Sequence, residues 1–174
     1  MNWHQLISNK RLGQEDLHYQ KRDDRTEFHR DYDRLIFSSP FRRLQNKTQV
    51  FPLPGSIFVH NRLTHSLEVA SVGRSLGDDV SRRLLEKHPE LHNSHLSECG
   101  SIVSAACLAH DMGNPPFGHS GERAIAAYFA EGAGQKYQSL VTPEQWKDFV
   151  LYDGNANAFR LLTHQFLGLI YVIF

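Results

Sequence analysis

The sequence predicts an all-α protein, and three observations support this prediction. Apolar residues recur at helical spacing in several separate stretches of the chain. One stretch, residues 102–109 (IVSAACLA), carries no charge and has the composition of a helix that is buried on most sides. Prolines, glycines and capping residues lie between these stretches, at positions where helices begin or end.

Two helices are expected in the N-terminal part of the chain. The apolar positions of the first are Phe28, Tyr32, Leu35 and Ile36. They recur at helical spacing between charged residues. The second helix is short and ends near residue 44, because Ser39 is an N-cap residue and Pro40 suits the first helical position. Residues 50–59 (VFPLPGSIFV) contain two prolines and a glycine, which predicts a loop.

A long helix is expected over residues 63–85. Asn61 precedes it as an N-cap, its apolar residues recur at helical spacing, and Pro89 follows its end. A helix of this kind is expected to pack against the uncharged stretch over residues 102–109.

The second half of the chain begins with a rigid turn. Residues 115–118 contain two prolines and a glycine, which redirect the chain into a helix over residues 120–131 that ends at Gly132. Pro143 opens a further helix over residues 144–151.

Length and composition fit either one domain or part of a larger one. The 174 residues are 40% hydrophobic and carry no net charge, so bulk charge favours neither a nucleic acid nor a membrane surface. The charged N-terminus does not resemble a signal peptide, and the apolar run over residues 166–174 is shorter than the about 20 residues that a membrane span needs. Cys99 and Cys107 are expected to be reduced structural thiols of a cytoplasmic protein.

Two residues that can ligate a metal follow the apolar helix directly, namely His110 and Asp111. A buried aspartate is costly unless it is paired or bound to a metal, and the C-terminal end of a helix favours a cation. One His–Asp pair cannot fill a coordination sphere, and His65 on the adjacent helix is the best candidate for a third ligand. A lone histidine on a helix is more often simply hydrogen-bonded, so the residues alone leave the role of His65 open.

A second pair, His119 and Glu122, follows the rigid turn. Their spacing places both side chains on one helix face, so Glu122 can orient or polarise His119 for acid–base chemistry. The alternative is that His119 caps the helix and that Glu122 is simply favoured in a first helical turn.

Four basic residues lie near these motifs in the sequence, namely Arg42, Arg43, Lys47 and Arg62. A ligand that carries phosphate needs such donors. The alternative is a solvated surface, which fits Arg62 least because it lies about one helical turn before His65.

Two blocks together, HNRLTHSLEV (residues 60–69) and LAHDMGNPPFGHSGE (residues 108–122), resemble the HD superfamily of metal-dependent phosphohydrolases. The resemblance is greatest to its bacterial deoxyguanosine triphosphate triphosphohydrolase (dGTPase-like) branch, which residues 25–53 and 154–168 also resemble. It implies an HD-domain helical bundle.

The resemblance also implies a domain organisation. Residues 1–59 would form an N-terminal helical segment with a substrate loop, and residues 60–174 the first part of the HD domain. We expect the chain to be truncated, because its apolar end departs from the polar continuation of the family.

The resemblance assigns roles to single residues. His65, His110 and Asp111 would be three of the four ligands in the family's H…HD…D signature, whose last aspartate lies farther downstream than this chain extends. His119 and Glu122 would carry the catalytic step, although the sequence does not settle which of them serves the attacking water and which the leaving group.

Two further residues are implied to bind the substrate. Gln49 would contact the deoxyribose 3′-hydroxyl and Arg62 a phosphate. A buried amide that reads a hydroxyl discriminates well against analogues that lack it. The alternative for Gln49 is a loop glutamine bonded to the backbone.

The activity implied is metal-dependent hydrolysis of dGTP, or of another deoxynucleoside triphosphate, to deoxynucleoside and tripolyphosphate. Mg²⁺, Mn²⁺ or Co²⁺ would serve as the ion, and the histidine ligands favour a transition metal. The resemblance further implies a cytoplasmic homo-oligomer with single-stranded DNA or a nucleotide as effector and no membrane partner. Two alternatives stay open: an HD phosphomonoesterase or phosphodiesterase, and an inactive truncated remnant.

Overall fold

The computed structural model describes residues 3–11, 25–47 and 61–164, and all its regular elements are helices. The predicted all-α class is therefore confirmed. Gln49, the expected loop over residues 50–59 with the domain boundary that follows it, and the apolar run over residues 166–174 lie outside the described residues.

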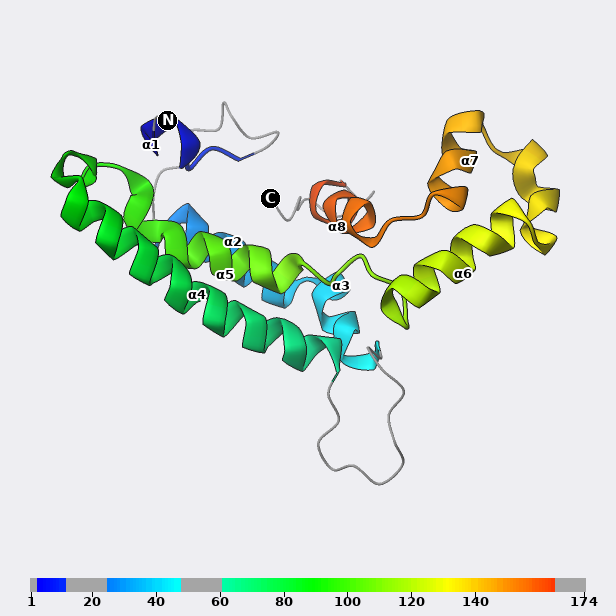
Figure 1. Ribbon diagram of the computed structural model, residues 1–174, viewed down its shortest axis with the longest axis horizontal. Coiled ribbons are helices and arrows are strands. Elements are labelled where there is room, and N and C mark those ends of the chain that lie inside the picture. Colours follow the sequence, from blue (N-terminus) through cyan, green and yellow to red (C-terminus); the bar gives the residue numbers. More distant parts are fainter. Residues whose placement is uncertain (1–2, 12–24, 48–60, 165–174) are drawn as a thin grey trace, which may run out of the picture.

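Two closely packed helices, α4 (Arg62–Lys87) and α5 (Cys99–Ala109), form the centre of the structure (Figure 1). The buried residues of α4 include a series of small ones that recur every three or four positions and so share one face: Ser66, Ala70, Gly73, Gly77 and Ser81. A Cβ added to Gly77 would lie 2.8 Å from the Cα of Gly100. The predicted packing of the long helix on the apolar helix is confirmed, and small residues are what bring the two backbones together.

The start of α4 is held by its predicted N-cap. The Oδ1 of Asn61 accepts a hydrogen bond from the backbone N–H of Thr64 at 2.9 Å, and the Thr64 hydroxyl accepts one from the Asn61 N–H at 3.3 Å. The helix extends one residue beyond the predicted start and two beyond the predicted end, and Pro89 opens the short 3-10 helix η2 (Pro89–Leu91).

The N-terminal helix α2 (Glu27–Phe37) packs on α5. Its Phe28 and Leu35 are buried, as their spacing predicted. Leu35 belongs to the main hydrophobic core, with residues of α3 (Ser39–Arg42), η1 (Arg43–Asn46), α4 and α5.

One predicted cap is wrong by a residue. Ser38 is the N-cap of α3, because its hydroxyl accepts a hydrogen bond from the N–H of Phe41 at 3.3 Å. Ser39 is the first helical residue and Pro40 the second. Proline is tolerated at both positions, because the first N–H groups of a helix have no partner within it.

The rest of the chain leaves the centre and returns to it. The outgoing part contains α6 (Gly118–Ala130), the 3-10 helix η4 (Ala133–Leu140) and α7 (Pro143–Val150), and no residue of α6 or α7 is buried. The last helix, α8 (Gly154–Thr163), returns to the centre (Figure 1). The helices predicted over residues 120–131 and 144–151 are confirmed with small shifts, whereas α8 was not predicted.

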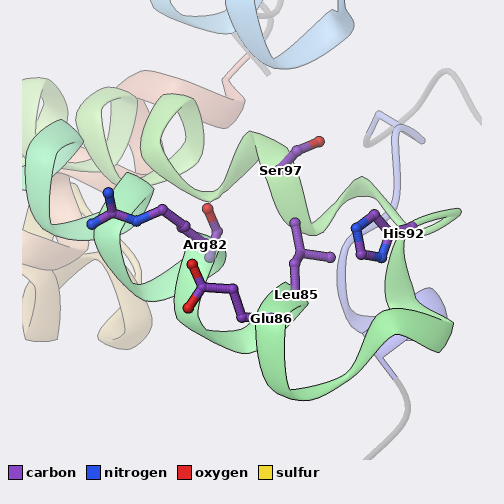
Figure 2. A pocket seen from close by; sticks show the side chains of 6 residues that line it. Arg82, Leu85, Glu86, His92 and Ser97 are labelled. Carbon is purple, nitrogen blue, oxygen red and sulfur yellow. The ribbon is translucent and has the colours of Figure 1, made fainter.

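A second, smaller hydrophobic core and a pocket lie at the C-terminal end of α4. This core joins Ile7, which follows α1 (Trp3–Leu6), to Phe28, Leu91 and Leu96, the last in η3 (His95–Glu98). The pocket has a volume of about 350 Å³ and lies beside the end of α4 (Figure 2). Its lining residues are Ser81, Arg82, Leu85, Glu86, His92 and Ser97. Within the described residues, no helix is long and apolar enough to cross a membrane.

Candidate metal centre

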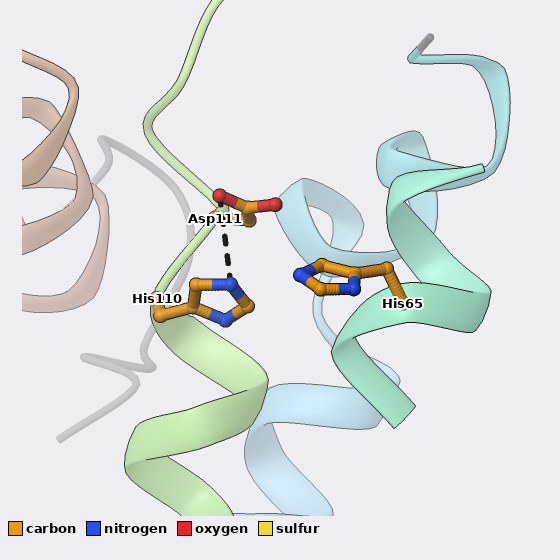
Figure 3. A group of neighbouring side chains, drawn as sticks. All are labelled: His65, His110 and Asp111. Carbon is orange, nitrogen blue, oxygen red and sulfur yellow. Dashed lines mark ion pairs between the residues drawn. The ribbon is translucent and has the colours of Figure 1, made fainter. Parts of the chain in front are cut away.

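The C-terminal end of α5 and the first turn of α4 bring three predicted ligands together. Helix α5 ends at Ala109, so that His110 is its C-cap and Asp111 follows it with 5% of its surface exposed. His65 lies in the first turn of α4, directly after the Asn61 cap. Each of His65, His110 and Asp111 offers one ligand atom within 4.8 Å of the others, and Figure 3 shows the three side chains gathered in one place.

The hydrogen bonds of His110 suit a metal ligand. Its Nδ1 lies 2.6 Å from the carbonyl oxygen of Cys107. Because a carbonyl only accepts, Nδ1 carries the proton and Nε2 keeps a free lone pair. This Nε2 lies 3.6 Å from the Oδ1 of Asp111 (Figure 3). A histidine that donates from one ring nitrogen to a carbonyl and offers the other is the usual arrangement at protein metal sites.

Asp111 also has the properties that a metal ligand requires. Its Oδ1 accepts a hydrogen bond from the Nδ2 of Asn114 at 2.7 Å. Its Oδ2 is buried and lies 2.8 Å from the Nη1 of Arg62, but the geometry of this ion pair is not that of a hydrogen bond. A buried carboxylate grouped with two imidazoles is a donor set that fits a divalent transition metal.

Arg62 is buried rather than solvated. It is 2% exposed, and its Nη2 would lie 3.3 Å from a Cβ added to Gly118. The guanidinium therefore lies between Asp111 and the start of α6. The surface alternative is wrong for Arg62, while its phosphate contact stays a prediction.

The other basic residues near the motif differ from Arg62. Arg42 and Arg43 are exposed, as the alternative reading expected. Lys47 is partly buried, and its ammonium donates to the carbonyl oxygen of Met112 at 3.4 Å. Burial, reinforced by the positive charge of Arg62, lowers the pKa of the Lys47 side chain.

The turn after Asp111 positions His119 and Glu122 at the start of α6. Phe117 and Gly118 both have positive φ angles, 68° and 55°, and this left-handed segment opens α6. The Nδ1 of His119 lies 2.7 Å from the Oε2 of Glu122. An ionised carboxylate only accepts, so Nδ1 donates and Nε2 is left free for proton transfer. Phe117 is the N-cap of α6, which makes the cap alternative for His119 wrong.

The returning helix α8 reaches the site, which the sequence reasoning missed. The backbone N–H of Gly154 donates to the Oε1 of Glu122 at 3.0 Å. The hydroxyl of Tyr152 and the side-chain amide of Asn157 both donate to the carbonyl oxygen of Gly113 at 2.9 Å. Asp153, a typical N-cap residue before Gly154, was the signal that this helix begins here.

Comparison with known proteins identifies a domain family and similar chains. Residues 62–146 match the family model of the HD domain. Over 171 residues the chain is 49% identical to a deoxyguanosinetriphosphate triphosphohydrolase-like protein of Synechocystis sp.. This alignment covers 97% of this chain and 38% of the relative.

Two further relatives carry the same name. One from Pseudomonas aeruginosa is 49% identical over 97% of this chain, and one from Listeria monocytogenes is 37% identical over 94% of it. The chain spans 38% and 37% of the length of these two relatives. Together with the HD-domain match over residues 62–146 and the helical fold, this similarity confirms the resemblance to HD-domain proteins seen in the motifs.

Proposed function

We propose that this chain is part of a metal-dependent phosphohydrolase that acts on a deoxynucleoside triphosphate, with dGTP as the first substrate to test. The observation that carries the proposal is the convergence of His65, His110 and Asp111 within 4.8 Å. The HD-domain match supports the reaction class, and the names of the relatives support the choice of substrate.

His65, His110 and Asp111 would hold the ion, and the family's last aspartate would complete the set. Two imidazoles and a carboxylate favour Mn²⁺ or Co²⁺ over Mg²⁺. When bound, such an ion polarises the α-phosphate and so favours attack by water.

The reaction needs one proton transfer that this chain's residues can serve. The oxygen of a water molecule bonds to the α-phosphorus, and the bond from that phosphorus to the 5′-oxygen breaks. A proton from the water ends on the 5′-oxygen, which yields deoxynucleoside and tripolyphosphate. The Nε2 of His119 would carry the proton, and Glu122 orients the ring through Nδ1 and stabilises its charged form.

Substrate contacts belong to the same proposal. Arg62 lies beside Asp111 with its positive charge inside the site, where it would contact a phosphate. Gln49, outside the described residues, stays a prediction for the 3′-hydroxyl. Oligomerisation, an effector of nucleotide or single-stranded DNA, and a cytoplasmic location also stay predictions.

The test is an assay of products. This chain and, separately, a full-length relative are incubated with Mn²⁺ and dGTP. Deoxyguanosine and tripolyphosphate are then separated by chromatography. We expect both products in equal amounts, and none from an Asp111→Ala variant. Hydrolysis of dGMP or a cyclic nucleotide without hydrolysis of dGTP would favour the phosphomonoesterase or phosphodiesterase alternative. Metal binding without any hydrolysis would favour the inactive remnant.

A further inference from the structure

We propose that Asn114 and Gly154 form a positioning pair that holds two carboxylates of the site, Asp111 and Glu122, in place at once. The inference rests on the proposed function, because it concerns the same site. It assigns a role to the first turn of α8, which lies far along the chain from both carboxylates.

Asn114 acts on the metal side of the pair. Its amide donates to the Oδ1 of Asp111 at 2.7 Å, and its backbone N–H donates to the Asp111 carbonyl at 3.3 Å. The backbone bond holds Asn114 in the turn, and the side-chain bond orients the carboxylate and leaves Oδ2 without a hydrogen bond. Side chains that orient a ligating carboxylate in this way commonly change metal affinity about 10-fold to 100-fold when they are removed.

Gly154 lies against the Asn114 amide and the Glu122 carboxylate. A Cβ at this position would overlap the Oδ1 of Asn114 and would lie 2.6 Å from the Oε1 of Glu122. The same glycine donates its backbone N–H to that Oε1 at 3.0 Å. A side chain on Gly154 would therefore displace Asn114 and Glu122 together.

The first turn of α8 is itself fixed to the turn that carries Asp111. Tyr152 and Asn157 both donate to the carbonyl oxygen of Gly113, and the amide of Asn157 also lies 3.1 Å from the Tyr152 hydroxyl. A Cβ on Gly113 would overlap the carbonyl oxygen of Gly154, so the two backbones meet without any side chain between them. The connection therefore runs from Asp111 through Asn114 and Gly154 to Glu122, and from there to His119.

The experiment measures Mn²⁺ affinity by titration calorimetry on the 174-residue chain. The variants are Asn114→Ala, Gly154→Ala, and the two combined, with Asn155→Ala as the control because Asn155 is exposed in the same turn of α8. Asn114→Ala and Gly154→Ala should each weaken binding at least tenfold, and the control should bind like the wild type. The combined variant should bind no more weakly than Asn114→Ala, because the added methyl then has no amide to displace.

Two readouts separate positioning from general stability. The visible absorption of bound Co²⁺ reports ligand geometry, which a loss of stability alone leaves unchanged, and it should change in Asn114→Ala. The imidazole NMR signals of His119 should shift in Gly154→Ala, because the added Cβ would displace the Glu122 carboxylate that orients the ring.

Wild-type affinity and an unaltered Co²⁺ spectrum in Asn114→Ala would overturn the inference while the proposed function stands. Strictly additive losses in the combined variant would also overturn it. If Gly154→Ala does not fold, Asn114→Ala decides alone, since it removes the contact without adding an atom. A wild-type chain that binds no Mn²⁺ would overturn the proposed function as well.

Discussion

The two halves of the candidate site are built in different ways. The proposed metal half lies where α4 and α5 pack. Its Arg62 and Asp111 are 2% and 5% exposed, whereas His65 is half-buried and His110 is exposed. The proposed proton-transfer half lies on α6, a helix without a buried residue, and the His119 side chain is 82% exposed. The buried ion pair of Arg62 and Asp111 depends on packing and charge balance, whereas the exposed His119 depends on one oriented hydrogen bond. Substitutions in one half should therefore lower mainly stability and metal affinity, and substitutions in the other half should lower mainly turnover.

The largest effect is expected on turnover in the exposed half. His119→Ala should lower the rate of dGTP hydrolysis about 1,000-fold, within the range for loss of a general acid or base. The metal content should stay at the wild-type level, because His119 is not among the grouped ligand residues. Kinetics and elemental analysis of the equivalent variant in an active full-length relative test this. Loss of the metal together with activity would make this histidine a ligand instead.

The next effect is on stability in the buried half. Arg62→Met should lower the free energy of unfolding of the metal-free protein by about 3 kcal/mol, because it removes the buried positive charge that pairs with Asp111. Mn²⁺ should restore much of this loss, since the ion replaces the positive charge. Urea denaturation with and without Mn²⁺ measures both quantities.

A matched control exists for the loss of a buried charge. Arg82 pairs with Asp79 on the surface of the same helix, and its side chain is 66% exposed. Arg82→Met should change the unfolding free energy by less than about 1 kcal/mol, with no response to Mn²⁺. Equal effects of the two arginine substitutions would contradict the difference between the halves.

A smaller effect is expected on metal affinity. His65→Ala should weaken Mn²⁺ binding at least tenfold, or about 1.4 kcal/mol, because it removes one bond to the ion. His92→Ala, an exposed histidine beyond the far end of α4, serves as the control and should bind like the wild type. Unchanged affinity in His65→Ala, measured by calorimetry, would remove His65 from the site.

The smallest effect concerns the cap that places His65. Asn61→Ala removes the capping box at the start of α4 and should cost about 1 kcal/mol of stability. Since His65 lies in the first turn after this cap, fraying there should also weaken Mn²⁺ binding slightly. Thermal melting and the same titration measure the two effects, and a loss of stability without any change in affinity would show that the first turn holds its shape without the cap.

Much of the central fold was predictable from the sequence. Helices α2 and α4 to α7 follow from apolar spacing, caps and prolines, which are local signals. Helix α8 was missed, because it is short, its first turn (GNAN) carries no large apolar residue, and its start is marked only by the cap of Asp153. The cap of α3 was placed one residue late, since Ser38 and Ser39 are chemically equivalent choices.

The site was predictable in its residue types but not in its contacts. Histidines and an aspartate at the end of an apolar helix pointed to a metal, and the structure brings them together. The ion pair of Arg62 with Asp111 and the approach of Gly154 to Asn114 join residues that are distant in the sequence. The need for glycine at position 154 becomes clear only once its neighbours Asn114 and Glu122 are known from the structure.

The central claim is that two histidines and one aspartate, from α4 and from the end of α5, hold one divalent ion. The most direct measurement is electron–nuclear double resonance of Mn²⁺ bound to the chain with ¹⁵N-labelled histidine. We predict hyperfine coupling to two imidazole nitrogens in the wild type and to one in His65→Ala or in His110→Ala. Bound Mn²⁺ without any coupling to a histidine nitrogen, or with both couplings retained in these variants, would contradict the account.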